Sequence, residues 1–194
     1  MSQSATERVY WTIADLALLP DNGTRYEIID GELFVTRAPR WRHQRVADNI
    51  CAALNQWSDA TKLGEATTTP GIIFSEANTV IPDVVWASYE RLALLLDESE
   101  HLTGAPELIV EVLSPGAENE RRDSEVKLKL HASQGVQEYW IVNRRLQQIQ
   151  VYRRQGATLK QVATLMASDE ITSPLLPGFA CSIASVFRSE LPAP

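Results

Sequence analysis

Two short apolar runs of this sequence each contain a single acidic residue that could do chemistry. Asp83 lies in the run Val80–Trp86, and Glu111 lies in the run Leu108–Ser114. Short runs rich in Val and Ile predict buried strands, and an ionised carboxylate in such a strand is destabilising unless a partner neutralises it. If the two strands are neighbours, the carboxylates converge, and a divalent cation between them removes their repulsion. The alternative is that each acid lies at a strand end in water or pairs with an arginine.

The ligand chemistry of such a site favours a hard cation. Side chains alternate along a strand, so Asp83 is predicted to share one face with Ile81 and Val85. Carboxylate oxygens without a cysteine or histidine cluster favour Mg²⁺ or Mn²⁺ over zinc. The two cysteines, Cys51 and Cys181, stand alone without a C-x-x-C spacing. We therefore expect neither a zinc site nor a disulfide framework.

Length and composition predict an ordinary globular protein. The chain has 194 residues, of which 44% are hydrophobic and 22% are charged, and this length predicts a single domain over residues 1–194. The longest aliphatic stretch is far shorter than the roughly 20 residues of a membrane span. Residues 1–8 lack the apolar core of a signal peptide. We therefore expect a cytoplasmic protein with no membrane partner.

Charge is distributed unevenly along the chain. The net charge of -7 gives no global attraction to nucleic acid, whose binding usually relies on Lys and Arg at phosphates. Arg37, Arg40, Arg42 and Arg45 nevertheless fall within nine residues. This cluster is either a solvated face or the lining of a groove. Arg40, Arg42 and Arg45 are therefore candidate nucleic-acid-binding residues.

The elements that must position these residues follow from hydrophobic spacing and turn residues. Helices are predicted at residues 12–19, 41–62, 89–96 and 120–133, with Gly64 and Gly135 as stops for the second and fourth. Asp30-Gly31 between two apolar runs predicts a β-hairpin over residues 26–35. Strands are predicted at residues 66–74, 80–87, 108–114, 138–142, 149–152 and 159–165, before a mostly irregular C-terminal part with a helical turn at 183–187. This order predicts an α/β fold around a mixed sheet.

Five sequence motifs, in this order and spacing, carry a resemblance to a known family. They are Tyr26–Glu32, Pro82-Asp83, Pro106–Pro115, Asp123-x-x-x-Lys127 and Gly135–Val142. Together they resemble the restriction-endonuclease-like proteins of the PD-(D/E)xK nuclease superfamily, over roughly residues 26–142. The resemblance implies a restriction-endonuclease-like core at about 25–143, a mixed β-sheet flanked by helices, an N-terminal hairpin and a strand-rich C-terminal extension.

The resemblance also implies roles for individual residues. Asp83 matches the Asp of the PD element and Glu111 matches the second acid, so both are implied to be catalytic and to bind the metal. The superfamily's usual lysine, two residues after the second acid, is replaced here by Leu113. The family pattern points instead to Lys127 as the catalytic lysine.

Helical spacing alone does not choose this lysine. Asp123, Lys127 and His131 are four residues apart and fall on one helix face, and Lys129 borders the same apolar stripe on its other side. Lys127 would act through its charge rather than as a base, because an unshifted lysine with a pKa of about 10.4 is neutral only about once in 250 molecules at pH 8. The structural alternative is an Asp-Lys pair on a solvated helix, worth about 0.2 to 0.5 kcal/mol.

Three further residues match family positions that could approach the metal. Glu27 and Glu32 flank the predicted hairpin turn, and His43 opens the predicted helix at 41–62. Glu27 and His43 are the accessory site candidates. Glu27 could instead lie on the solvent face of a strand, and His43 could be a surface or cap residue.

The function implied by the resemblance is a Mg²⁺- or Mn²⁺-dependent endonuclease that hydrolyses phosphodiester bonds, with DNA as the expected substrate. A homodimer would suit double-strand cleavage. The competing hypothesis is a catalytically inactive nuclease-fold module that binds nucleic acid or protein. The net charge and Leu113 support the inactive module, whereas the retained acids Asp83 and Glu111 oppose it.

Overall fold

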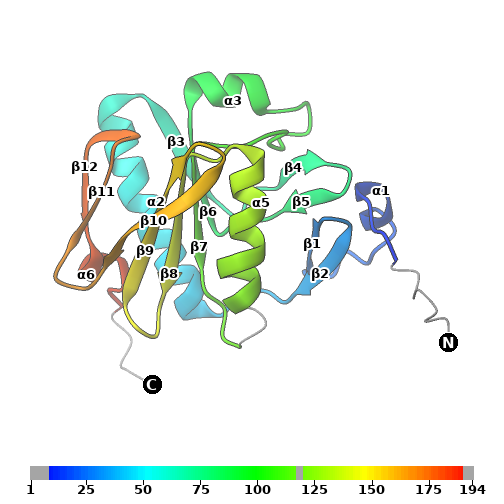
Figure 1. Cartoon of the computed structure of the whole chain (residues 1–194), viewed down its shortest axis with the longest axis horizontal. Helices are drawn as coiled ribbons and strands as arrows, with labels where there is room; N and C mark the ends of the chain where they lie inside the picture. Colours follow the sequence, from blue (N-terminus) through cyan, green and yellow to red (C-terminus); the bar gives the residue numbers. More distant parts are fainter. Residues whose placement is uncertain (1–8, 117–119, 190–194) are drawn as a thin grey trace.

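The computed structural model describes residues 9–116 and 120–189, so both ends of the predicted domain lie outside the described residues. Its centre is a six-stranded sheet with the strand order β10-β9-β8-β7-β6-β3 (Figure 1). These strands are β3 (Gly64–Thr68), β6 (Val84–Ser88), β7 (Leu108–Val112), β8 (Glu138–Asn143), β9 (Gln148–Gln155) and β10 (Thr158–Leu165). Only β7 and β8 pair in parallel. The mixed α/β fold predicted from the sequence is confirmed.

Helices cover both faces of this sheet (Figure 1). Helix α2 (Trp41–Thr61) lies on one face, where its buried residues Val46, Ile50 and Leu54 join the same core as Val110 of β7. Helix α5 (Lys127–Gln134) lies on the other face and packs Leu130 into a second core with Ile109. Residues of β7 therefore alternate between two cores, as expected for a strand that is covered on both sides. Helix α5 ends at Gly135, as predicted.

A second sheet carries the N-terminal hairpin. Its strand order is β2-β1-β5-β4, formed by β1 (Arg25–Ile29), β2 (Glu32–Thr36), β4 (Ile72–Ser75) and β5 (Asn78–Val80). The hairpin turn at Asp30-Gly31 has positive φ angles of 51° and 74°. These angles fit the type I′ turn that an Asp-Gly pair favours, so the predicted hairpin is confirmed.

Two predicted strands are wrong in extent. The strand predicted at 66–74 is two strands in different sheets, β3 and β4, because Thr69 adopts a left-handed φ of 57° before Pro70-Gly71. The strand predicted at 80–87 is also divided, into β5 and β6, because Pro82 lacks the N–H that a sheet ladder needs. Asp83 therefore precedes β6 and does not share a strand face with Ile81.

The short helices form where the sequence predicts them. Helices α1 (Ile13–Leu16), α3 (Tyr89–Leu95) and α6 (Ile183–Val186) lie within the predicted ranges. Helix α2, however, ends at Thr61 and is capped by Lys62 in the left-handed conformation, and Gly64, the predicted stop, begins β3.

The prolines predict a mostly irregular C-terminal part, and this is wrong, whereas the strand-rich C-terminal extension that the resemblance implies is confirmed. It forms the antiparallel ribbon β11 (Glu170–Ser173) and β12 (Leu176–Ser182). Ile171, Leu176 and Phe179 of the ribbon are buried against the core that contains α2. Pro177 is tolerated because the ribbon has two strands, so each strand is an edge. No helix within residues 9–116 and 120–189 is long and apolar enough to cross a membrane.

Candidate active site

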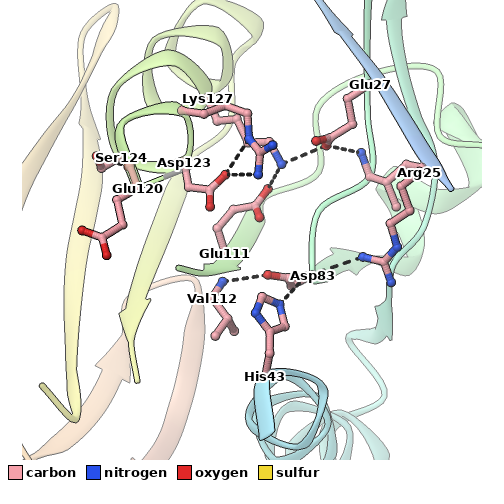
Figure 2. Close-up of polar contacts among 12 residues, drawn as sticks. Arg25, Glu27, His43, Asp83, Glu111, Val112, Glu120, Asp123, Ser124 and Lys127 are labelled. Carbon is pink, nitrogen blue, oxygen red and sulfur yellow. Dashed lines mark hydrogen bonds and ion pairs between the residues drawn. The ribbon is translucent and has the colours of Figure 1, made fainter. Parts of the chain in front are cut away.

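The two predicted acids lie where β6 begins and β7 ends. Strands β6 and β7 are antiparallel neighbours, and their register pairs Val84 with Val110. Asp83 and Glu111 are the next residues beyond this pair, which places them at the same edge of the sheet. The close-up in Figure 2 shows both side chains in one site, together with side chains from β1, α2 and the helix after β7.

Asp83 is held by contacts on both carboxylate oxygens. The backbone N–H of Val112 donates a hydrogen bond of 2.8 Å to Oδ2. His43 Nε2 lies 3.0 Å from Oδ1, and Arg25 Nη1 lies 3.9 Å from the same oxygen (Figure 2). Burial acts to raise the pKa of Asp83, but His43 and the Val112 N–H outweigh it and lower this pKa. Asp83 is therefore an ionised carboxylate at neutral pH.

Lys127 lies between two buried glutamates. Its Nζ atom is 2.8 Å from Oε1 of Glu111 and 2.8 Å from Oε1 of Glu27 (Figure 2). Burial acts to lower the pKa of Lys127, but Glu111 and Glu27 outweigh it and raise this pKa above its ordinary value. Burial, reinforced by Asp83, raises the pKa of Glu111 against the opposing effect of Lys127. Lys127 is thus an ammonium, whereas Lys129 is exposed on the outside of the helix.

A π-helical turn places Lys127 in the site. Helix η1 (Arg122–Val126) leads into α5, and the Lys127 N–H donates to the carbonyl of Arg122, five residues earlier. This turn also buries Asp123, whose carboxylate lies 2.9 Å from Arg122 Nη2 and whose carbonyl accepts the Tyr139 hydroxyl at 2.8 Å. Burial, opposed by Lys127 and Arg122, raises the pKa of Asp123. Single-turn π-helices often occur at functional sites.

Glu27 and His43, the two accessory candidates, are both in the site. Glu27 is 3% exposed and His43 is 7% exposed, so neither is the solvent-facing residue that the alternative interpretation required. Glu27 Oε1 also accepts a hydrogen bond of 2.9 Å from the N–H of Ile81, which joins β1 to the segment that carries Asp83.

Sequence reasoning missed two arginines of the site. Arg25 could have been found, because it lies two residues before Glu27 and therefore on the same strand face. Arg122 gave no such signal. It is adjacent to Asp123 in the sequence, and adjacent residues of an ordinary α-helix do not lie on the same face.

The site residues surround a small hollow that opens into a larger one. The inner hollow has a volume of about 50 Å³ and is lined by Glu27, Asp83, Glu111 and Lys127, among others. The outer hollow, of about 320 Å³, shares Arg37, His43 and Arg122 with the inner one.

The predicted nucleic-acid-binding arginines lie at different distances from this site. Arg40 lines the outer hollow, whereas Arg42 and Arg45 line a third hollow of about 470 Å³. The structure thus brings Asp83, Glu111 and Lys127 together and spreads the predicted arginines outward from them.

The donor set suits a hydrated hard cation better than a fully protein-bound ion. Within the described residues, no group of three or more His, Cys, Asp or Glu side chains is arranged to hold a metal ion. Mg²⁺ needs fewer, because it keeps several waters and is usually bound through one or two carboxylates. The inner hollow of about 50 Å³ can hold a few waters. His43 also lines this hollow, and its Nε2 lies 3.0 Å from Asp83 Oδ1.

Comparison with known proteins identifies the family. A sequence model described as "Putative restriction endonuclease" matches residues 13–184. The chain belongs to this family, Uma2. The resemblance inferred from the five motifs is therefore confirmed. No curated protein matches the chain.

One solved structure supports the Uma2 assignment at the level of the fold. It is the crystal structure of a protein described as a putative nuclease belonging to DUF820, from Anabaena variabilis ATCC 29413. It is similar with a TM-score of 0.71 and 18% sequence identity, over 91% of this chain and 97% of that one.

Proposed function

We propose that this protein is a divalent-metal-dependent endonuclease that hydrolyses phosphodiester bonds in DNA. The observation that carries the proposal is the position of Lys127, whose Nζ lies 2.8 Å from Glu111 Oε1 in the hollow that Asp83 also lines. Leu113 stands where the superfamily usually has its lysine, and in this proposal Lys127, on the following helix, takes that role. Membership of the Uma2 family supports nuclease chemistry in general.

Asp83 and Glu111 would hold the metal, and His43, whose Nε2 lies 3.0 Å from Asp83 Oδ1, would orient that carboxylate. Restriction-endonuclease-like proteins generally use divalent metals, and the carboxylate-rich donor set favours Mg²⁺ or Mn²⁺. Such an ion, when bound, supplies positive charge to a phosphate oxygen and lowers the pKa of an attacking water. His43 and, to a lesser extent, the Val112 N–H lower the pKa of Asp83 against the effect of burial, and the Val112 N–H also orients the carboxylate for this role.

Lys127 would stabilise the negative charge that develops on the phosphate in the transition state. Its pKa is raised by Glu111 and Glu27 after the opposing effect of burial, so it stays protonated at neutral pH. A protonated lysine cannot act as a general base, but electrostatic stabilisation requires no deprotonation. Glu27 is then a positioning residue, because it holds Nζ on the side opposite Glu111.

Arginines at the rim of the site would bind the phosphates on either side of the scissile one. Arg25 and Arg122 line the inner hollow, and Arg40 lines the outer one. Guanidinium groups bind phosphate oxygens through paired hydrogen bonds. Arg42 and Arg45 would contact phosphates farther along the strand.

The second candidate function is a nuclease-fold module without activity. One observation favours it: Lys127 already neutralises Glu111 in the described structure, so a metal is not needed to relieve the charge on that glutamate.

Cleavage assays separate the two functions. Wild type, Asp83→Asn and Glu111→Gln are incubated with labelled single-stranded and duplex DNA in Mg²⁺, Mn²⁺ or chelator, and Glu65→Gln, an exposed acid on β3, is the control. The proposal expects metal-dependent cleavage by wild type and control, and a loss of about 100-fold or more in both site variants. Absence of cleavage by wild type with either metal would favour the inactive module.

A further inference from the structure

Three hollows follow one another from the site to the far side of the β8–β9 turn. The inner and outer hollows share Arg37 and Arg122. The outer hollow and the third share Arg144 and Pro115. The outer and third hollows, of about 320 and 470 Å³, are therefore adjacent, and the outer one adjoins the active site. We refer to the two together below as the arginine trough.

The trough is lined by positive charge from four separate parts of the sequence. Its arginines come from the start of α2 and the segment before it, from η1, from the β8–β9 turn and from the segment after α6; they are Arg37, Arg40, Arg42, Arg45, Arg122, Arg144, Arg145 and Arg188. None of the lining residues that the structure describes is acidic. This concentration is notable in a chain whose net charge is -7.

The arginines of the trough are crowded. Burial, together with the charges of Arg42 and Arg40, lowers the pKa of Arg144. Like charges that lower one another's pKa raise the free energy of the unliganded protein. An anion bound among them removes this repulsion, and a chain of phosphates could do so along the whole trough.

The far end of the trough combines arginines with an aromatic ring. Phe187 lines the third hollow beside Arg145 and Arg188. Unpaired bases stack on aromatic side chains while arginines hold the backbone, which is the usual arrangement in proteins that bind single strands. The bases of an intact duplex are stacked on each other and are not available for this contact.

The depth of the active site also favours a single-stranded substrate. The side chains of Asp83 and His43 are 7% and 9% exposed, and that of Lys127 is 3% exposed. A scissile phosphate must therefore enter a hollow of only about 50 Å³. Duplex DNA is stiff, with a persistence length of about 50 nm, whereas a single strand can bend into such a recess.

From the trough, its aromatic end and the recessed site together, we propose that the substrate is bound as a single strand. The strand runs from the active site past Arg144 to Phe187. This inference rests on the proposed nuclease function and specifies the form of its substrate.

Binding without cleavage tests the proposal. Fluorescence anisotropy of a labelled oligothymidine and of a duplex of equal length is measured in chelator with wild type, Arg145→Gln, Arg188→Gln and Phe187→Leu. The control Lys160→Gln removes a charge from an exposed residue of β10. Lys160 lies opposite Arg153 in the β9–β10 register, away from the β8–β9 turn. Circular dichroism confirms that each variant is folded.

The proposal expects tighter binding of the single strand than of the duplex. Each arginine substitution should lower the slope of log K against log salt by about 0.7, the value for one phosphate contact on a single strand. Phe187→Leu should weaken single-strand binding about fivefold, the lower end of the range for one stacked base, and leave duplex binding unchanged. Lys160→Gln should bind as wild type.

Other results are informative in different ways. Equal or tighter binding of the duplex would overturn the single-strand inference. Arginine variants that bind as wild type would show that the trough is not the binding site. If trough variants behave as expected but no metal supports cleavage, the nuclease proposal fails while the binding inference stands. If cleavage is metal-dependent but the trough variants change nothing, the inference fails alone.

Discussion

Lys127 is the residue on which the proposed chemistry depends, and it also forms buried contacts that stabilise the site. It is 2% exposed and contacts two glutamates that are 3% exposed. Removing one partner of a buried ion pair typically destabilises a protein by about 3 to 5 kcal/mol, because the remaining charge has no water to solvate it. Loss of activity in a Lys127 variant must therefore be measured alongside its folding.

His131, one turn after Lys127, gives the structure a testable pH dependence. It is fully buried between Phe74 and Tyr139, and in the described part of the chain neither ring nitrogen has a hydrogen-bond partner. Burial and the charge of Lys127 lower the pKa of His131 to about 3. The unfolded chain binds this proton near pH 6.5 and the folded chain does not, so stability is lost as the pH falls from 6.5 toward 3.

We predict that His131→Phe removes this part of the acid sensitivity. At pH 5 the buried neutral histidine should cost wild type about 2 kcal/mol relative to pH 7.5, because each unit of pKa difference corresponds to about 1.4 kcal/mol. Urea unfolding at the two pH values measures the difference, and His101→Gln, which changes an exposed histidine, is the control. An unchanged pH dependence in His131→Phe would show that folding does not lower the pKa of His131.

At the scale of elements, the β1–β2 hairpin connects the second sheet to the active site. Strand β1 carries Arg25 and Glu27, and Glu27 contacts both Lys127 and the N–H of Ile81. The geometry of the hairpin turn therefore affects the position of Lys127, the proposed catalytic lysine.

Gly31 in this turn should be more sensitive to substitution than other glycines with positive φ. A Cβ on Gly31 would lie 2.3 Å from the ring of Tyr10, whereas a Cβ on Gly23, with a φ of 77°, meets nothing within 4 Å. Both alanine variants incur the backbone strain of about 1 kcal/mol or more. We predict that Gly31→Ala is destabilised more than Gly23→Ala, because the exposed ring of Tyr10 must also move away from the new Cβ. Equal unfolding free energies of the two variants would contradict this contact.

Elements with clear periodicity could be predicted from the sequence, and the irregular connections between them could not. The apolar spacing of α2 and the Asp30-Gly31 turn each specify one local structure. Pro82 interrupts a run that reads as one strand, and its effect depends on the two sheets that the flanking segments join. The C-terminal ribbon was missed because its prolines are compatible with an edge strand as well as with an irregular segment.

The site was predictable where chemistry and spacing agreed. Asp83 and Glu111 could be identified because acids in apolar runs require partners. Lys127 needed the family pattern, because helical spacing allowed Lys129 equally. The π-helical turn that aligns Arg122 and Lys127 depends on hydrogen bonds made in the folded chain. The spacing of residues in the sequence therefore does not predict it.

At the scale of the whole molecule, metal binding at the proposed site would be coupled to folding. Asp83 and Glu111 approach each other only when β6 and β7 pair. Mg²⁺ or Mn²⁺ that binds this native site stabilises it by mass action, by about 2.7 kcal/mol at a hundred times its Kd.

We predict that either ion raises the melting temperature of wild type by several degrees, since each kcal/mol corresponds to about 2 to 4 °C in a chain of this size. Asp83→Asn should lose most of this rise. Thermal unfolding with and without the ion measures the effect, with Glu65→Gln as a folded control at an exposed acid. A rise of equal size in Asp83→Asn would mean that the ion binds elsewhere.

The most direct test of the account compares the two lysines of the helix after β7. Cleavage of one labelled DNA substrate is measured under single-turnover conditions for wild type, Lys127→Ala, Lys127→Arg and Lys129→Ala, below the unfolding temperature of each. If the charge of Lys127 replaces the one missing at Leu113, Lys127→Ala should lose about 100- to 1,000-fold in rate, the usual scale for one preorganised electrostatic contact. Lys127→Arg should retain more of the rate, and Lys129→Ala should cleave as wild type. A folded Lys127→Ala that cleaves at the wild-type rate, or a larger loss in Lys129→Ala, would contradict the account.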